Sequence, residues 1–155
     1  MMKVVLTMLS LFMWCVMFVS ITSASDEAFT IKFGLMEKDR TGTYHVYSET
    51  TTIPQHLRKT GFRFGFTVEH PSGETFIGYK IVYLPGPPKH ITGGLERAGK
   101  KEREWIIQSS PKTYKGSWKD SFWFDEGDPT GKWRIEIYVN NTLLRVVNFT
   151  VVPVK

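Results

Sequence analysis

The sequence predicts an all-β protein: one antiparallel β-sandwich domain of about seven to eight strands. The first reason is that apolar and polar residues alternate with a period of two along most of the chain, as in half-buried strands. The second is that glycine, proline, asparagine and aspartate cluster between these stretches, where turns are needed. The third is that no stretch of the domain carries a sustained apolar stripe at helical spacing.

Alternating residues place the main strands. They are expected at residues 29–35, 62–69, 77–83, 132–139 and 147–151. In 77–83, Ile77, Tyr79, Ile81 and Tyr83 form the apolar side of the alternation, with Lys80 and Val82 between them. Asn140 and Asn141 tolerate the positive φ of a tight hairpin between the last two strands.

Three further stretches have weaker strand patterns. Residues 44–53 are rich in threonine and tyrosine, and their irregular alternation indicates an edge strand. Shorter strands are expected at 104–108 and 118–124. In the second of these, Trp123 falls on the face opposite Trp118, and Trp105 lies next to the basic stretch. An exposed tryptophan pair could stack on sugar rings; the alternative is core packing with one aromatic ring half-covered by a loop.

The N-terminus has the layout of a secretory signal. Lys3 precedes an uncharged apolar run, 4–21, and small residues follow it. We therefore expect a signal-peptide helix at 1–24, cleaved after Ala24, and a single domain at 25–155. Cleavage after Ser25 and retention as a membrane anchor are the alternatives, since the run approaches the roughly 20 residues that span a bilayer.

Cysteine usage agrees with export to a bacterial envelope. The single cysteine, Cys15, lies within the signal segment, so the mature domain would contain none. Small secreted eukaryotic domains usually carry disulfides. Their absence favours a periplasmic or secreted bacterial protein that is stable through its core alone, which about 130 residues can provide.

One region of the sequence points to recognition. Residues 85–101 begin with a proline-rich run and show no convincing strand, and long loops of this kind are usually functional or disordered. The surrounding segment 85–119 holds eight lysines and arginines against three glutamates. The predicted ligand-binding residues are Lys89, Arg97, Lys100, Lys101, Arg103 and Trp105. The alternative is that this basic stretch is only a solvated surface.

The sequence contains no pattern for catalysis or for a bound cofactor. The four histidines lack the spacing of a zinc site, and no phosphate-binding glycine motif or serine-hydrolase elbow occurs. We therefore expect no metal, no cofactor and no catalytic residue. Asp125, Glu126 and Asp128 form an acidic run that is expected to be a solvated turn, although a carboxylate pair for glycoside hydrolysis depends on separation in space.

Several motifs together resemble a known family. They are Phe33-Gly34-Leu35, Ile53-Pro54, Gly61-Phe62-Arg63-Phe64-Gly65-Phe66, Phe122-Trp123-Phe124-Asp125-Glu126, Gly131-Lys132-Trp133-Arg134-Ile135-Glu136-Ile137 and Phe149-Thr150-Val151-Val152-Pro153. Their order and spacing resemble the bacterial domain-of-unknown-function family 3859, across nearly the whole mature chain. The resemblance implies a small exported protein with an immunoglobulin-like sandwich, and it brings no catalytic residues.

These observations lead to three functional hypotheses. The first is a non-enzymatic periplasmic or secreted binding module for an envelope protein or an anionic glycan, with no nucleic-acid partner and no membrane span after signal cleavage. The second is a small envelope enzyme that acts on glycans through the acidic run at 125–128. The third is an assembly or chaperone subunit that uses the edge strand at 44–53 for β-augmentation.

Overall fold

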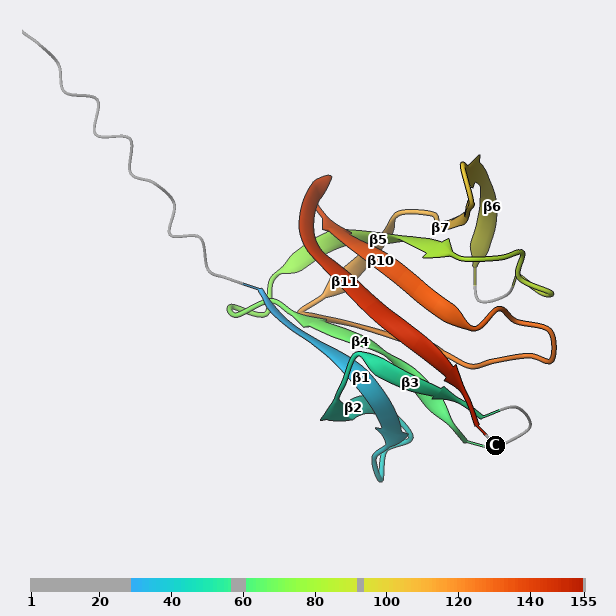
Figure 1. Ribbon diagram of the computed structural model, residues 1–155. Helices are drawn as coiled ribbons and strands as arrows, with labels where there is room; N and C mark the ends of the chain where they lie inside the picture. The colour runs from blue at the N-terminus through green and yellow to red at the C-terminus, as the bar shows by residue number, and fades with distance from the viewer. Residues whose placement is uncertain (1–28, 57–60, 92–93, 155) are drawn as a thin grey trace, which may run out of the picture.

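The computed structural model describes residues 29–56, 61–91 and 94–154, and every regular element in these ranges is a β-strand. Eleven strands form two sheets (Figure 1). Within these ranges no helix is long and apolar enough to cross a membrane. The signal-peptide helix expected at 1–24 lies outside the described residues.

The four-stranded sheet has the order β2-β1-β4-β9. Its strands are β1 (Thr30–Lys38), β2 (Tyr44–Glu49), β4 (Arg63–Glu69) and β9 (Ser117–Phe122). All three pairings are antiparallel. The strands β2 and β9 are therefore its edges.

The seven-stranded sheet has the order β3-β11-β10-β5-β7-β6, with β8 paired to β5 outside this path. Its strands are β3 (Thr52–Gln55), β5 (Thr75–Leu84), β6 (Leu95–Lys101), β7 (Glu104–Ser109), β8 (Lys112–Lys115), β10 (Gly131–Val139) and β11 (Thr142–Pro153). Only the β3–β11 pairing is parallel among the described strands. Its larger number of strands makes this sheet wider than its partner.

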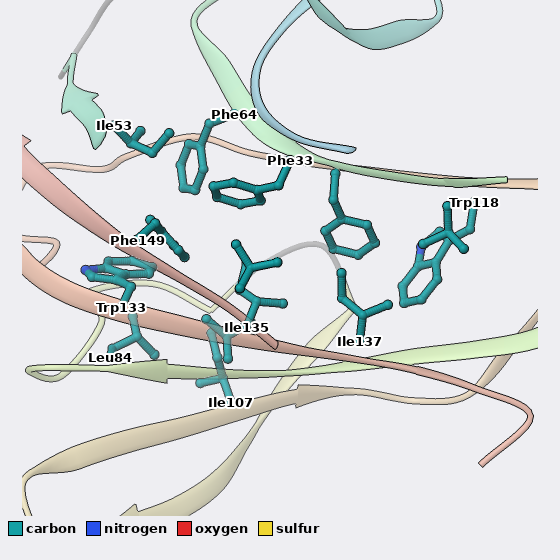
Figure 2. Packing of buried hydrophobic residues seen from close by; sticks show 14 of the residues in the cluster. Phe33, Ile53, Phe64, Leu84, Ile107, Trp118, Trp133, Ile135, Ile137 and Phe149 are labelled. Atoms are coloured by element: carbon teal, nitrogen blue, oxygen red, sulfur yellow. The ribbon is translucent and has the colours of Figure 1, made fainter. Parts of the chain in front are cut away.

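The core lies between the two sheets. Figure 2 shows Phe33 and Phe64 of the four-stranded sheet opposite Trp133 and Phe149 of the seven-stranded sheet. The Phe33 and Phe149 rings are 4.9 Å apart between centroids. Burial alternates along β10 and β11, so the predicted period of two is confirmed there, whereas β4 is buried at five consecutive positions, 64–68.

Gly65 explains part of the Phe-Gly-Phe motif on β4. A Cβ atom at this position would lie 2.0 Å from the backbone oxygen of Asp120 on β9. A side chain would therefore push β9 away from β4. The flanking residues Phe64 and Phe66 are both buried in the core, so the motif combines close strand approach with inward-facing aromatic rings.

The fold class is confirmed as a β-sandwich, and the Asn140-Asn141 hairpin is confirmed as well. The two asparagines have φ values of 48° and 64°. The strands outnumber the expected seven to eight for two reasons. The stretch 44–53 divides between β2, at the edge of one sheet, and β3, at the edge of the other. The short strands β6 and β8 are the additional ones.

Two expectations from the sequence were wrong. The segment 85–101 is not strandless, because Leu95–Lys101 forms β6 and pairs with β7. The apolar side of β5 was also misassigned: Val82 and Lys80 face the core, while Tyr79 and Ile81 face outward and are only half-buried. Both faces of β5 carry apolar residues, so alternation alone could not identify the buried one.

Candidate ligand-binding site

The β6–β7 hairpin, residues 95–109, extends the seven-stranded sheet beyond the rest of the sandwich, and we call it the overhang. Figure 1 shows β6 standing away from the four-stranded sheet. The strand β5 joins the overhang to the core, since it pairs with β7 on one side and with β10 on the other. The face of the overhang that continues the inner face of the sheet is therefore only partly covered.

Two cations lie over one tryptophan on this inner face. Trp105 is half-buried against the core, opposite Leu84 on one side and Lys100 on the other. The Arg97 guanidinium carbon is 4.8 Å from the Trp105 ring centroid, and the Lys100 Nζ atom is 5.6 Å from it. Both distances are within the range of a cation–π interaction. The indole thus holds two exposed cations in place.

Two acidic residues of the overhang, Glu96 and Glu104, lie on its other face, and Glu102 lies in the turn at its tip. Glu104 pairs with Arg134 of β10 through Oε2 and Nη2 at 3.3 Å, and Arg134 stacks over the Tyr83 ring at 3.8 Å. None of the ion pairs found among the described residues involves Arg97 or Lys100. Strand alternation therefore separates the charges: the inner face is basic, although the hairpin as a whole is nearly balanced.

The other predicted residues lie at two separate places. Lys101 and Arg103 are exposed at the tip of the hairpin, where Glu102 takes the positive φ of 54° that the turn requires. Lys89 lies against a different turn: its backbone N–H is 3.4 Å from an oxygen of Asp128. The structure thus brings Arg97, Lys100 and Trp105 together. It places Lys101 and Arg103 at the tip of the same hairpin and Lys89 at a separate turn.

A small cavity opens beside the overhang, between the two sheets. Its volume is about 70 Å³. Leu84, Leu95 and Ile107 line it from the seven-stranded sheet, and Phe122 and Trp123 line it from β9 and the residue that follows. Since one water molecule needs roughly 10–15 Å³, the cavity can hold several. Sequence reasoning did not find this cavity, because its walls come from segments far apart in the chain.

An ion pair forms one wall of the cavity. Lys80 of β5 donates a hydrogen bond to Asp120 of β9, and the two side chains are 3% and 23% exposed. The Lys80 ammonium also lies 5.2 Å from the Phe122 ring centroid. The sequence does carry a signal for this pair, a lysine between the inward-facing residues Gly78 and Val82. This signal can be recognised only once the inward-facing side of β5 has been assigned correctly.

Asp128 has a structural role in the turn at 125–128. Its carboxylate accepts hydrogen bonds from the backbone N–H of Asp125 at 2.7 Å and from that of Lys89 at 3.4 Å. Burial raises the pKa of Asp128 above its ordinary value. Asp125 and Asp128 both line the cavity. Over the described ranges, no group of three or more histidine, cysteine, aspartate or glutamate residues could hold a metal ion.

The aromatic residues around β9 lie as the sequence predicted. Trp118 and Phe124 are buried, whereas Trp123 is 41% exposed. The Arg63 guanidinium is 4.9 Å from the Trp123 ring centroid. Trp123 is among the residues that line the cavity, but its ring packs beside Arg63 on the side of the chain opposite Trp118.

Comparison with known proteins supports the fold. Residues 31–152 match the family model described as the PM0630 beta sandwich domain. This agrees with the expected β-sandwich family of bacteria, while membership of family 3859 in particular stays a prediction. No curated protein matches the chain.

Two solved structures match the chain at low similarity. One is an immunoglobulin-like protein (PA1606) from Pseudomonas aeruginosa, at 20% identity and a TM-score of 0.47, covering 79% of this chain and 92% of that one. The other is the Pseudomonas fluorescens alkylpurine DNA glycosylase AlkC bound to DNA containing an abasic site analog. It is 11% identical, with a TM-score of 0.34, and the match covers 78% of this chain and 30% of the glycosylase.

Proposed function

The chain belongs to the PM0630 beta sandwich domain family, and we propose that it is an exported, non-enzymatic binding module for an anionic partner. The partner is an envelope protein or an anionic polymer. The observation that carries this proposal is the position of Arg97 and Lys100 over Trp105 on the inner face of the overhang.

The arrangement suits binding because the cations are already positioned. Long basic side chains lose rotamer entropy when a ligand immobilises them, which lowers affinity. The half-buried Trp105 ring limits that loss for Arg97 and Lys100, while their N–H donors stay accessible to a ligand. The carboxylate of Glu104 points to the opposite face and pairs with Arg134, so it does not compete for these donors.

Export and family 3859 membership are part of the proposal. They are supported by the apolar run at 4–21, the small residues that follow it and the motifs of β4 and β10. A periplasmic or secreted location would give the basic face access to acidic envelope components. The non-enzymatic reading is supported by Asp128, whose carboxylate oxygens accept backbone hydrogen bonds of a turn, and this weakens the case for glycan hydrolysis by residues 125–128.

The test uses polyglutamate as the anionic probe, with binding measured by calorimetry at low and high salt. Replacing Arg97 and Lys100 together with alanine should weaken binding about tenfold, as two charge contacts of about 0.5–1 kcal/mol each would give. Wild-type binding should also weaken with salt, because exposed charges are screened.

The matched control removes the same charge elsewhere. Lys32 and Lys119 are exposed and flank Thr67 on the outer face of the four-stranded sheet. The double variant Lys32→Ala/Lys119→Ala should bind polyglutamate nearly as well as the wild type. If the two double variants lose affinity equally, the binding reflects net charge alone and the proposed site is wrong.

One observation favours the third hypothesis as a second candidate. The strand β2 is an edge of the four-stranded sheet, as the sequence predicted for this stretch, so one side of its backbone is open to an added strand. Tyr47 on this strand is 54% exposed. This candidate would be favoured if Tyr47→Pro or Ser48→Pro abolished the binding of a partner protein while the overhang variants had no effect on it.

A further inference from the structure

We propose that the anionic partner is an acidic polysaccharide: one sugar ring enters the cavity beside the Lys80–Asp120 pair, and the acid groups of the chain contact Arg97 and Lys100. This inference rests on the proposed function and names its ligand class. It combines the cavity and the basic face of the overhang into one binding surface.

The ion pair supplies both kinds of hydrogen-bonding group to the cavity. The Lys80 ammonium has three N–H donors, and Asp120 is the acceptor found for it among the described residues. Asp120 uses one of its two carboxylate oxygens in this bond. A sugar hydroxyl both donates and accepts, so neighbouring hydroxyls can bind Lys80 and Asp120 at once. A purely apolar group would leave these buried polar atoms without the hydrogen bonds that water provides.

The charge around the cavity favours a neutral group inside it. Lys80 compensates Asp120, while Asp125 and Asp128 add two further carboxylates to the lining. A carboxylate of the ligand would be repelled there and attracted to Arg97 and Lys100. The hydroxylated ring therefore enters the cavity, and the acid groups lie over the overhang.

The aromatic lining suits the less polar face of a sugar ring. Phe122 is partly buried in the wall, and the Lys80 ammonium lies 5.2 Å from its ring centroid. A cavity of about 70 Å³ takes one edge of the sugar ring, with the remainder outside its mouth.

The cavity and the cations are close enough to bind one chain. Leu95 lines the cavity, and Arg97 lies two residues further along the same strand, about 6–7 Å away. Ile107 also lines the cavity and is the register partner of Arg97. A ring in the cavity thus places the adjoining part of the polymer beside Arg97.

The experiment compares the binding of three probes to the domain at residues 25–155. Oligogalacturonate carries sugar rings and acid groups, polyglutamate carries acid groups alone, and dextran carries neutral sugar rings alone. Oligogalacturonate should bind at least about fivefold more tightly than polyglutamate of equal charge, and dextran weakly. The double variant Lys80→Met/Asp120→Leu removes the polar groups of the cavity, so it should lose this preference and bind polyglutamate unchanged. The variant Lys32→Ala/Lys119→Ala, on the outer face of the four-stranded sheet, should retain the preference.

The outcomes separate this inference from the proposed function. If oligogalacturonate and polyglutamate bind equally and both depend on Arg97 and Lys100, the anionic binding module stands and the sugar site is wrong. If neither probe binds, both proposals are wrong. Because an apolar pair can replace an ion pair at little cost, the double variant should fold. The amide signals of Ser121 and Ile107 should shift on adding oligogalacturonate to the wild type. Unchanged signals would also overturn the sugar site.

Discussion

The central sandwich and the overhang are stabilised by different interactions. In the centre, both sheets contribute aromatic and branched side chains, and Phe66, Ile137 and Ile53 are fully buried. In the overhang, the inner face of β6 and β7 has no complete covering sheet. There a cation–π cluster around Trp105 and the neighbouring Lys80–Asp120 pair take the place of close apolar packing.

This difference shows where a small sandwich can leave room for a ligand. Two sheets of equal width would bury the inner face of every strand. Here the seven-stranded sheet continues past β9, the edge of its partner, so polar and charged side chains can occupy inward-facing positions. Stability should therefore depend mainly on the centre, and binding mainly on the overhang.

The largest effect is expected in the centre, from Phe64→Ala. Phe64 is 1% exposed, and its ring lies 4.8 Å from Phe124 and 5.8 Å from Phe149 between centroids. Its truncation should lower the free energy of unfolding by about 3–5 kcal/mol, because the remaining cavity cannot collapse. Urea denaturation provides the measurement.

The matched change in the overhang is Trp105→Ala. The Trp105 ring is only half-buried, so its removal should lower the free energy of unfolding by about 1–2 kcal/mol. Equal losses for Phe64→Ala and Trp105→Ala would contradict the division into a stabilising centre and a binding overhang.

The next effect concerns the boundary between the two regions. Lys80→Met leaves the partly buried Asp120 without its cation and should lower the free energy of unfolding by about 3 kcal/mol. The double variant Lys80→Met/Asp120→Leu should recover most of this loss, since an apolar pair can replace an ion pair at little cost. Urea titration of both variants and of Asp120→Leu completes the cycle, and additive losses would show that the two residues are not coupled.

Much of the centre could be predicted from the sequence, because one face of each central strand is clearly more apolar. The alternation of Trp133, Ile135 and Ile137 identified the buried face of β10 correctly. β5 was misassigned because Tyr79 and Ile81 on its outer face are as apolar in pattern as Val82 on its inner face. Which face is buried depends on the partner sheet, and this information is not local.

The candidate site was predicted only in part, for the same reason. Arg97, Lys100 and Trp105 were identified from composition, but their common face required the register of β6 and β7. The bulge between Arg97 and Gly99 changes the alternation, so sequence spacing alone would misplace one of the two cations. The cavity was not predictable, since Lys80 and Asp120 are 40 positions apart in the chain.

The smallest expected effect is a dependence of stability on pH, which the central sandwich should show and the overhang should not. Burial, followed by the hydrogen bond to Glu136, raises the pKa of Tyr138 on β10 from 10.0 to about 12. The contribution of this residue is fully present below pH 10 and is lost as pH rises from about 10 to about 12, because the unfolded chain gives up the proton first. Residues 95–109 contain no tyrosine, so the overhang lacks this response.

The variant Tyr138→Phe isolates this contribution from the lysines that titrate in the same range. Its free energy of unfolding should fall less steeply than that of the wild type between pH 9 and pH 11. Tyr138 donates its hydrogen bond to Glu136 at 3.0 Å, and the Tyr83 hydroxyl donates to the same oxygen at 3.1 Å. If Tyr138→Phe and the wild type respond identically to pH, the fold does not hold the Tyr138 hydroxyl in its protonated form. The outer face of the seven-stranded sheet then adds no stability through this group.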